Sequence, residues 1–509
     1  MRETFTSRWS LLLAALGMAI GTGNIWRFPR VIAQNGGAPF LIPWFLFLFL
    51  WSIPLLIVEF GMGKKTRMGT IGAFSSMRSS HTWMGGFVGL CTLAITFYYS
   101  VVTGWCFRYT TAALIDLLAG SHRVPGGGIW GAETTTFWSS FISTHWQPVL
   151  FHLIAILFGS WIIYRGVVNG IEKANRILIP SLFVLLIIAG VRAITLPGAV
   201  KGLNFLFEPN WKALLNYKIW LEGLSQSAWS TGAGWGLILT YAVYMRKNDD
   251  IVANSFLSGL GNNSASLLAA IAIIPTVFAI LPTEKALEVV SDTGPASTGL
   301  TFIWIPKLFE QISAGKFFLV LFFLALSIAA LSSLISMIEL GTRIMMDFGL
   351  TRRKGIAIVG SVSFLLGLPS ALSLTFFQNQ DWVWGVGLLL SGFFFAITII
   401  RYGVEKFRLE MVDTPDNDIR LGRIFNFTIS ILIPVEFVML ISWWFAQVIL
   451  KFDPHFWWHP FRPFSIGTCL LQWGTLILIL ILLNKKIKGA LAGSFVPVEE
   501  VSENAPEER

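Results

Sequence analysis

Long apolar runs without charged side chains recur along almost the whole of this chain. A helix needs about 20 apolar residues to cross the hydrocarbon core of a bilayer. Ten charge-free runs lie between consecutive charged residues. Two more spans each include a charged residue or stop at one: 9–26 stops at Arg27, and 424–450 contains Glu436. The sequence therefore predicts an all-α membrane protein with twelve transmembrane helices. They lie within 9–26, 31–58, 79–107, 134–164, 177–191, 223–245, 251–283, 317–338, 355–380, 382–400, 424–450 and 463–484.

The composition agrees with a chain that lies mostly in a membrane. Only 13% of the 509 residues are charged, whereas soluble domains carry about 25%. A net charge of +9 would suggest nucleic acid in a soluble protein. Here the surplus of Lys and Arg belongs to loops, so no nucleic-acid partner is expected. Three cysteines in apolar runs, without CxxC spacing, indicate neither a zinc site nor a disulfide.

The distribution of Lys and Arg predicts the orientation. An even number of spans places both termini on one side of the membrane. Loops on that side hold 24 of the 37 basic residues and loops on the other side hold 10, while Arg27, Arg30 and Arg108 sit at span ends. Because cytoplasmic loops are enriched in Lys and Arg, we expect cytoplasmic N- and C-termini and a multi-pass protein of the plasma (inner) membrane.

Two spans contain internal glycine clusters, one in 17–24 and one in 230–236. Helix interruptions at membrane depth are tolerated only where protein or a cavity satisfies the freed backbone. The clusters fall in the first and sixth spans, which are equivalent if two five-helix halves are inserted in opposite directions. Paired interruptions of this kind indicate the midplane site of a secondary transporter. The alternative is a pair of small-residue packing faces.

The residues of the first cluster also carry a family resemblance. Gly21-Thr22-Gly23-Asn24-Ile25-Trp26-Arg27-Phe28-Pro29, followed by Asn35-Gly36-Gly37, resembles the signature of the neurotransmitter:sodium symporter family, and in particular its bacterial, leucine-transporter-like amino-acid branch. The resemblance covers about residues 1–450. Further matching positions are Ile53-Pro54, Glu59, Tyr98-Tyr99, Arg165-Gly166, Gly170-Ile171-Glu172-Lys173, Gln226 to Gly236, Tyr241, Tyr244-Met245-Arg246-Lys247, Asn262, Leu331-Ser332-Ser333 and Asp381-Trp382.

This resemblance implies a leucine-transporter-type fold with 5+5 inverted repeats and two extra C-terminal helices. The first half is then 1–200, the second half 201–423, the extra helices 424–488, and 489–509 a polar cytoplasmic tail. The implied function is sodium-coupled symport by alternating access, in which a neutral L-amino acid is imported. No catalytic residues are expected, because the mechanism needs no covalent chemistry.

The resemblance also implies two sodium sites. Asparagine and backbone oxygens suit a hard cation of low charge. Without the resemblance, interhelical hydrogen bonds would explain the asparagines, and bonds within their own helix would explain the serines. The first site comprises Ala19, Asn24, Ser230 and Asn262, and the second comprises Gly17, Ile20, Ala329, Ser332 and Ser333.

The implied substrate pocket lies between the two clusters. Gly21 stands where monoamine transporters of the family carry an Asp that pairs with the substrate amine, so a neutral glycine leaves room for a zwitterion. Because Gly232 and Ala233 are small, we expect a hydrophobic or aromatic amino acid, although Trp229, Trp235 and Met337 also take up volume. The implied pocket residues are Ala19, Gly21, Thr22, Gly23, Ile95, Tyr99, Trp229, Ser230, Gly232, Trp235, Ser333 and Met337.

Two gates follow from the same resemblance. Arg27 and Asp381 resemble an outer salt bridge, with Tyr99 and Trp235 as an aromatic lid beneath it. Arg2 and Asp347 resemble an inner ionic latch, near Tyr244 and Phe5, where Phe5 replaces a frequent Trp.

Chloride is a candidate third ion. Chloride-independent bacterial members often carry a carboxylate where this chain has Ser266, and a bound anion could supply that charge beside sodium. Gln226, Ser230, Asn262 and Ser266 match the chloride ligands of the family, whereas Trp44 stands where a Tyr hydroxyl is expected. The alternative to chloride is a sodium site that is proton-linked or that needs no added negative charge.

Other functional classes fit the sequence less well. A channel would need charge rings along a pore, and an enzyme would need a His, Asp or Glu cluster. A transport-inactive amino-acid sensor of the same fold is the remaining alternative. Glu59 is expected to bond to backbone inside the bundle. The sequence assigns no firm role to Glu436, for which an interhelical hydrogen bond in protonated form is the simplest interpretation. The expected partners are the amino acid and the lipid bilayer, and the sequence identifies no protein partner.

Overall fold

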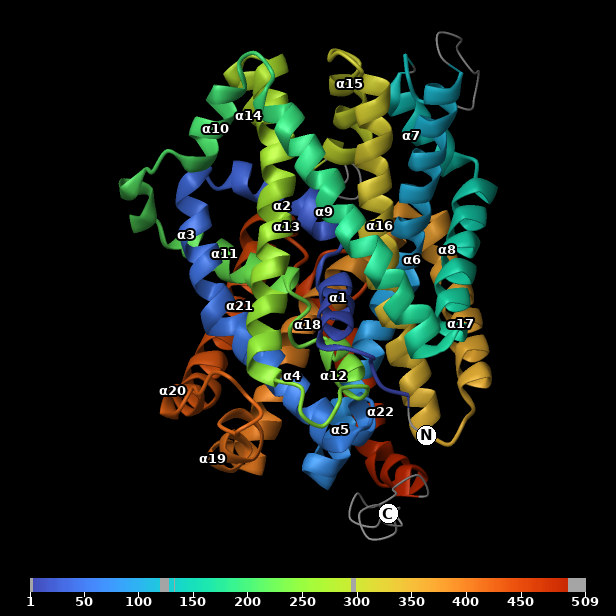
Figure 1. Ribbon diagram of the computed structural model, residues 1–509, viewed down its shortest axis with the longest axis vertical. Helices are drawn as coiled ribbons and strands as arrows, with labels where there is room; N and C mark the ends of the chain where they lie inside the picture. The colour runs from blue at the N-terminus through green and yellow to red at the C-terminus, as the bar shows by residue number, and fades with distance from the viewer. Residues whose placement is uncertain (1–2, 120–127, 132, 294–298, 493–509) are drawn as a thin grey trace, which may run out of the picture.

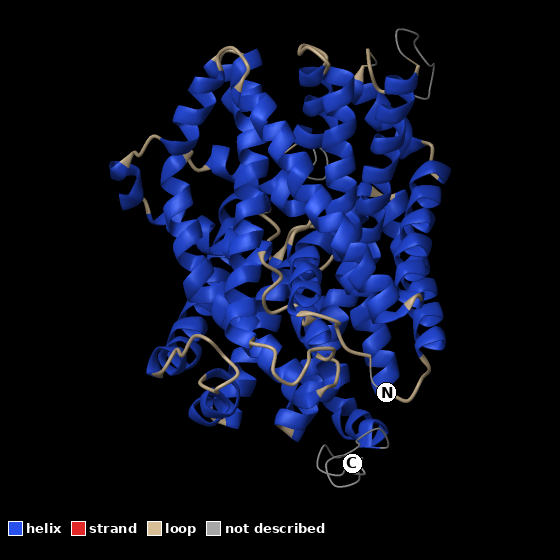
Figure 2. Cartoon of the chain, in the orientation of Figure 1, coloured by secondary structure: helices blue, strands red, loops and turns tan. Residues whose placement is uncertain are grey.

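The computed structural model describes residues 3–119, 128–131, 133–293 and 299–492. Almost all of this part of the chain is helical, and it contains no β-strand (Figure 2). Ten of its helices are long and apolar enough to cross a membrane. A further pair, α1 (Arg8–Ala19) and α2 (Thr22–Gln34), forms an eleventh span that is bent by 53°.

The ten long helices match ten of the predicted spans in order. Several contain a π-helical or 3-10 turn, labelled η. In chain order they are α3–η1–α4 (Ala38–Phe47, Leu48–Ser52, Ile53–Thr66), η2–α6 (Ser79–His81, Thr82–Leu118), α8 (Trp146–Tyr164), η3–α9 (Val167–Glu172, Lys173–Ile194), α13 (Ile251–Ile280), α16 (Gly315–Asp347), α17 (Arg352–Leu372), α18 (Leu374–Tyr402), α20–η8–α21–η9 (Arg423–Phe427, Thr428–Leu432, Ile433–Gln447, Val448–Phe452) and α22 (Ile466–Ala492).

The predicted sixth span consists of two short helices, α11 (Tyr217–Ser230) and α12 (Leu237–Ala242). Neither is long enough to cross a bilayer alone, and six residues, 231–236, separate them. The interruption falls on the second glycine cluster, as the sequence predicts. Together with the bent first span, the interrupted span accounts for the twelve that the apolar runs indicate.

Shorter helices connect the spans. They are α5 (Thr70–Met77), α7 (Thr134–Ser143), α10 (Ala199–Phe207), η4 (Trp211–Leu215), α14 (Thr283–Ser291), η6 (Gly299–Trp304), α15 (Ile305–Phe309), α19 (Val404–Phe407) and η7 (Arg408–Val412). The sequence indicates that the run 134–164 is only partly span, and its first part forms the separate short helix α7 rather than a loop.

The border between the ninth and tenth spans also differs from the prediction. The sequence places it at Asp381, the only charge in that region, but α17 ends at Leu372. The hydroxyl of Ser373 accepts a hydrogen bond from the backbone N–H of Phe376 at 3.3 Å and so caps α18. A serine cap marks a helix start independently of charge, and Asp381 therefore lies inside α18 rather than before it.

Helices α6 and α16 form the centre of the bundle. In each of them 83% of the apolar stretch is buried, whereas in α22 only 28% is. Helices α1, α2 and α12 contact α16. Outer helices such as α9 and α22 expose apolar side chains, as a lipid-facing surface would. The first described residues and the end of α22 lie at the same end of the bundle (Figure 1), as an even number of spans requires.

Close packing of α6 against α8 depends on Gly104, and this gives a stability test. A Cβ at Gly104 would lie 2.7 Å from the backbone carbonyl carbon of Phe151 and 2.8 Å from the backbone nitrogen of His152. Gly104→Val should therefore destabilise the protein by about 1–3 kcal/mol, measured as a lower melting temperature in detergent. Gly474→Val in α22 is the matched control, because no atom lies within 4 Å of the added Cβ. Equal melting temperatures for the two variants would contradict the packing described.

Candidate functional site

The first helix break exposes backbone groups that side chains from other helices satisfy. Helix α1 ends at Ala19 and α2 begins at Thr22, so the N–H groups at the start of α2 have no partner in their own helix. The N–H of Gly21 donates to Asn24 Oδ1 at 2.9 Å, and the N–H of Thr22 donates to the hydroxyl of Tyr99 at 3.2 Å. Tyr99 on α6 thus supports the α2 terminus from across the bundle.

The second break is held by a buried carboxyl group. Gly232, Gly234 and Gly236 all have positive φ values, between 70° and 85°, a region that favours glycine. Glu59 on α4 is 0% exposed, and its two oxygens accept from the N–H groups of Gly234 at 2.6 Å and Leu239 at 3.1 Å. These contacts confirm the expectation that Glu59 bonds to backbone within the bundle.

The residues predicted for the first sodium site lie together between the two breaks. The Nδ2 of Asn24 donates to Asn262 Oδ1 and to Ser266 Oγ, both at 2.7 Å. The side-chain amide of Asn262 also places one terminal atom 3.0 Å from the carbonyl oxygens of both Ala19 and Ser230. Carbonyls released by each break therefore converge on one amide.

Two orientations of the Asn262 amide have different chemical consequences. With its oxygen toward Ala19 and Ser230, three acceptors face one another without a proton between them, an arrangement that a cation would stabilise. With its NH₂ group there, the amide donates to both carbonyls. The two orientations have nearly the same shape. The same residue therefore offers either an acceptor or a donor to the two carbonyls.

The residues predicted for the second sodium site lie where α16 crosses the end of α1. The hydroxyl of Ser333 donates toward the carbonyls of Met18 at 3.3 Å and Ile20 at 3.4 Å. Ser332 donates to Ala329 in its own helix at 3.0 Å. Ser333 therefore links two helices, whereas Ser332 follows the pattern of a helix-internal hydroxyl. The fifth predicted ligand, Gly17, packs against Asn175 of α9, whose Oδ1 lies 2.0 Å from where a Cβ would be.

Several of the predicted substrate residues surround the first break. A Cβ at Gly21 would lie 3.1 Å from both the Ser333 and the Tyr99 hydroxyl oxygens, so an Asp at this position would not fit without rearrangement. Gly23 has no atom within 4 Å of its Cβ position and faces open space. A Cβ at Gly232 would lie 2.7 Å from the Met18 sulfur. Ala19, Thr22 and Ser230 belong to the same region through the contacts described above.

The remaining predicted pocket residues come from the central helices and the second break. Ile95 on α6 and Met337 on α16 are 2% and 1% exposed. Trp235 is anchored through its carbonyl, which accepts from the Thr92 hydroxyl at 2.6 Å. Thr92 has no place in the sequence prediction, since a single threonine in an apolar span carries no signal of its own.

The outer gate differs from its prediction. No ion pair joins Arg27 and Asp381 within 4.0 Å among the described residues; instead the Arg27 guanidinium lies over the Trp229 ring, 4.4 Å from its centroid. The attraction between a cation and an aromatic face explains this position. The aromatic side chain in contact with Arg27 is thus Trp229, whereas the prediction placed Trp235 in the lid.

The inner end of the site is covered by the N-terminal segment. The N–H of Phe5 donates to the carbonyl of Tyr244 at 3.0 Å, and the two rings pack edge to face with centroids 6.4 Å apart. Phe5 therefore packs at the position where a Trp is frequent. Asp347 pairs with Arg343 at 3.0 Å. Arg2, its predicted partner in the inner latch, lies outside the described residues, as do residues 493–509 of the predicted tail.

Gln226, one of the predicted chloride ligands, and Trp44 each carry a buried polar atom without a hydrogen-bond partner in the described part of the chain, Oε1 and the indole nitrogen. An indole N–H is a donor, so Trp44 offers the same kind of group as the hydroxyl expected there.

Glu436 on α21 is 2% exposed, and neither of its carboxyl oxygens has a described partner. Among the described residues, Glu436 thus lacks the interhelical hydrogen bond that is its simplest interpretation from sequence.

The role of Glu59 gives a second test. Glu59→Gln keeps one oxygen acceptor but turns an NH₂ group toward the other backbone donor, so one of Gly234 and Leu239 loses its partner. A buried donor without a partner costs about 1–3 kcal/mol, and we expect a lower melting temperature in detergent. Glu288→Gln, which removes only an exposed pair with Lys285, should change it by less than about 1 kcal/mol. A Glu59→Gln protein as stable as the Glu288→Gln control would contradict this assignment.

Known proteins are similar to this chain in both sequence and fold. The model of the sodium:neurotransmitter symporter family matches residues 2–124 and 139–488. An uncharacterized sodium-dependent transporter of Methanocaldococcus jannaschii is 32% identical over 380 residues, which cover 70% of this chain and 73% of the relative. The sodium-dependent serotonin transporter of Drosophila melanogaster is 27% identical over 445 residues, covering 80% and 71%.

Among solved structures, MhsT in complex with L-phenylalanine matches with a TM-score of 0.74 and 29% identity, over 87% of this chain and 99% of MhsT. An all-helical, multi-span fold is thus shared over almost the whole chain. The family match extends over most of the sequence, including both helix breaks. The chain therefore belongs to the sodium:neurotransmitter symporter family, a family of sodium-dependent membrane transporters rather than enzymes.

Proposed function

We propose that the chain is a sodium-coupled symporter that imports a neutral, hydrophobic or aromatic L-amino acid by alternating access. The observation that carries the proposal is the convergence of the Ala19 and Ser230 carbonyls on the Asn262 amide, between the two helix breaks. Oxygens without protons form the ligand set that a hard monovalent cation requires. Asn24 contacts the same group and also caps Gly21, so the ion site adjoins the start of α2.

The start of α2 fits the carboxylate of an amino acid. Helix N-termini attract anions through the positive end of the helix dipole. Gly21 supplies no competing carboxylate, and the space at Gly23 is open. These features support a zwitterion over an amine that lacks a carboxylate. The structural match to MhsT bound to L-phenylalanine supports a hydrophobic or aromatic side chain.

Coupling follows from the shared position of ion and substrate. A carboxylate at the start of α2 would complete the sodium shell formed by Ala19, Asn24, Ser230 and Asn262. Each ligand then raises the affinity for the other, and the joint occupancy shifts the population of conformations. A second sodium ion at Gly17, Ile20, Ala329, Ser332 and Ser333 would tie the end of α1 to α16. Chloride beside Ser266 is part of the proposal as a third ion.

The gates support alternating access rather than a continuous pore. Phe5 covers the inner end beside Tyr244, while Arg27 and Asp381 at the other end are not paired. The inner end is therefore closed by backbone and aromatic contacts, while at the outer end Arg27 and Asp381 have not formed their ion pair. We propose that substrate binding draws Arg27 from the Trp229 ring toward Asp381.

Transport by proteoliposomes tests this function. An inward sodium gradient should drive accumulation of labelled L-phenylalanine or L-leucine above the outside concentration, and dissipating the gradient should abolish it. Equilibration without accumulation would indicate a channel, and sodium-dependent binding without uptake would indicate a sensor.

The first sodium site is tested in the same preparation. Asn24→Ala removes the acceptor for Gly21 and the donor to Asn262, so sodium-stimulated substrate binding should fall at least tenfold, measured by scintillation proximity. Asn204→Ala, at an exposed position of α10, is the matched control and should bind as the unmodified protein does. Unchanged sodium stimulation in Asn24→Ala would refute the site.

Ser266 tests the role of chloride. Its hydroxyl lies 2.7 Å from Asn24 Nδ2, so Ser266→Glu would place a fixed negative charge beside the sodium ligands. We expect transport by this variant to be independent of chloride, because its charge replaces that of the anion. Ser266→Gln has the same size without the charge and should not become independent. A chloride requirement that persists in active Ser266→Glu protein would exclude the assignment.

A further inference from the structure

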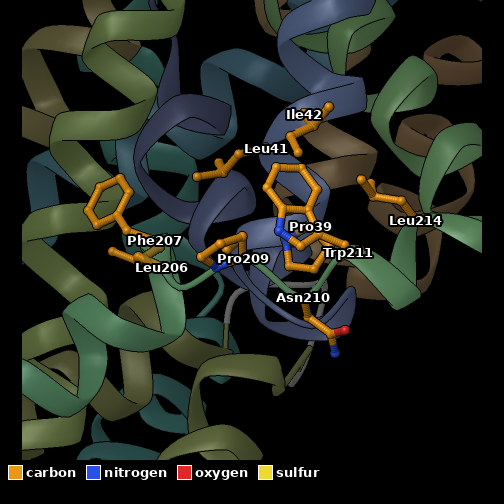
Figure 3. A pocket seen from close by; sticks show the side chains of 10 residues that line it. Pro39, Leu41, Ile42, Leu206, Phe207, Pro209, Asn210, Trp211 and Leu214 are labelled. Atoms are coloured by element: carbon orange, nitrogen blue, oxygen red, sulfur yellow. The ribbon is translucent and has the colours of Figure 1, made fainter.

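A pocket lies on the side of the bundle, between the first turns of α3 and the segment from α10 to η4 (Figure 3). Its volume is about 190 Å³, below the range of typical small-molecule sites. Asn210 is the only polar residue among the ten that line it, and its amide points away from the apolar side chains (Figure 3). The Trp211 ring lies close to Ile42 of α3 in the same view.

The pocket continues into a surface that faces acyl chains. Ile42, Phe45 and Leu46 on α3 are 39%, 49% and 40% exposed, and they belong to a membrane span. Trp211 and Leu215 on η4 are 66% and 88% exposed. Exposed tryptophan beside the first turn of a span is typical of the membrane–water interface. An apolar occupant that reaches the pocket from the bilayer is therefore favoured over a water-soluble one.

Basic side chains accompany this pocket. Loops at the end of the bundle opposite the termini hold 10 basic residues, and four of them fall in 192–218, with Glu208 as the only acidic residue of that segment. Lys212 follows Trp211 directly, and Lys218 lies four residues after Leu214. Both lysines are exposed, and neither belongs to an ion pair of the described residues. Positive charge at an interface attracts anionic lipid head groups.

We propose that this pocket binds one anionic phospholipid, with an acyl chain between α3 and η4 and its phosphate near Lys212 and Lys218. The occupant inserts from the leaflet at the end of the bundle opposite the termini. The site is separate from the helix breaks, so its existence does not depend on the transported substrate. An acyl chain there would hold the loop that leads into α11 against α3.

Native mass spectrometry of the purified, full-length protein tests the proposal, with dioleoyl phosphatidylglycerol and dioleoyl phosphatidylcholine as probes. The unmodified protein should retain phosphatidylglycerol preferentially. The double variant Lys212→Gln/Lys218→Gln should reduce retention of one phosphatidylglycerol by roughly fivefold for each lysine and leave phosphatidylcholine unchanged. Leu214→Trp, which fills the pocket, should remove the same lipid without changing the charge.

Matched controls separate this site from general attraction to the protein surface. Lys285→Gln/Lys307→Gln removes two basic residues from the same end of the bundle and should not change retention. Glu208→Gln, beside the pocket, should retain at least as much phosphatidylglycerol as the unmodified protein. Equal retention of the two lipids, or an unchanged lysine variant, would overturn the proposal. Displacement of the lipid by millimolar inorganic phosphate would do the same, because it would show a phosphate site instead.

Discussion

Backbone hydrogen bonding inside a bilayer is the constraint on which this structure depends. Two spans are interrupted at membrane depth, and without water each free N–H or carbonyl needs a protein partner. Glu59 supplies both acceptors for the second break, while Asn24 and Tyr99 supply them for the first. The partners come from α4, α2 and α6, so the breaks are stable only within the assembled bundle. The open backbone of a transport site is thus a property of the tertiary structure.

The partners of the carbonyls differ from those of the N–H groups. The donors are satisfied by fixed acceptors, whereas the Ala19 and Ser230 carbonyls face an amide that can present either oxygen or nitrogen. At the proposed sodium site, a cation would therefore compete with an internal hydrogen bond rather than with an empty space. The carbonyls would regain a partner when the ion leaves, which would keep binding reversible.

Much of the fold follows from the sequence, because crossing a bilayer demands long apolar runs and breaking a helix there demands glycine. Both glycine clusters coincide with interruptions, and Glu59 has the backbone partners expected of it. The start of α18 was missed because a serine cap, not Asp381, sets it. The stacking of Arg27 on Trp229 was also missed, since a cation in a span can pair with either a carboxylate or a ring, and only the three-dimensional arrangement decides between them. The sodium, chloride and substrate assignments stay predictions until ions and substrate are tested directly.

The hydrogen bond between Phe5 and Tyr244 joins the segment before α1 to the turn that follows α12. The inner halves of the two broken spans are thereby joined by a hydrogen bond between main-chain atoms. Opening the inner end must either carry both halves as one body or break this link first. A bulky fusion protein placed just ahead of Glu3 would hinder the opening of the inner end directly. Fused reporter proteins for studies of transport turnover are therefore better attached elsewhere.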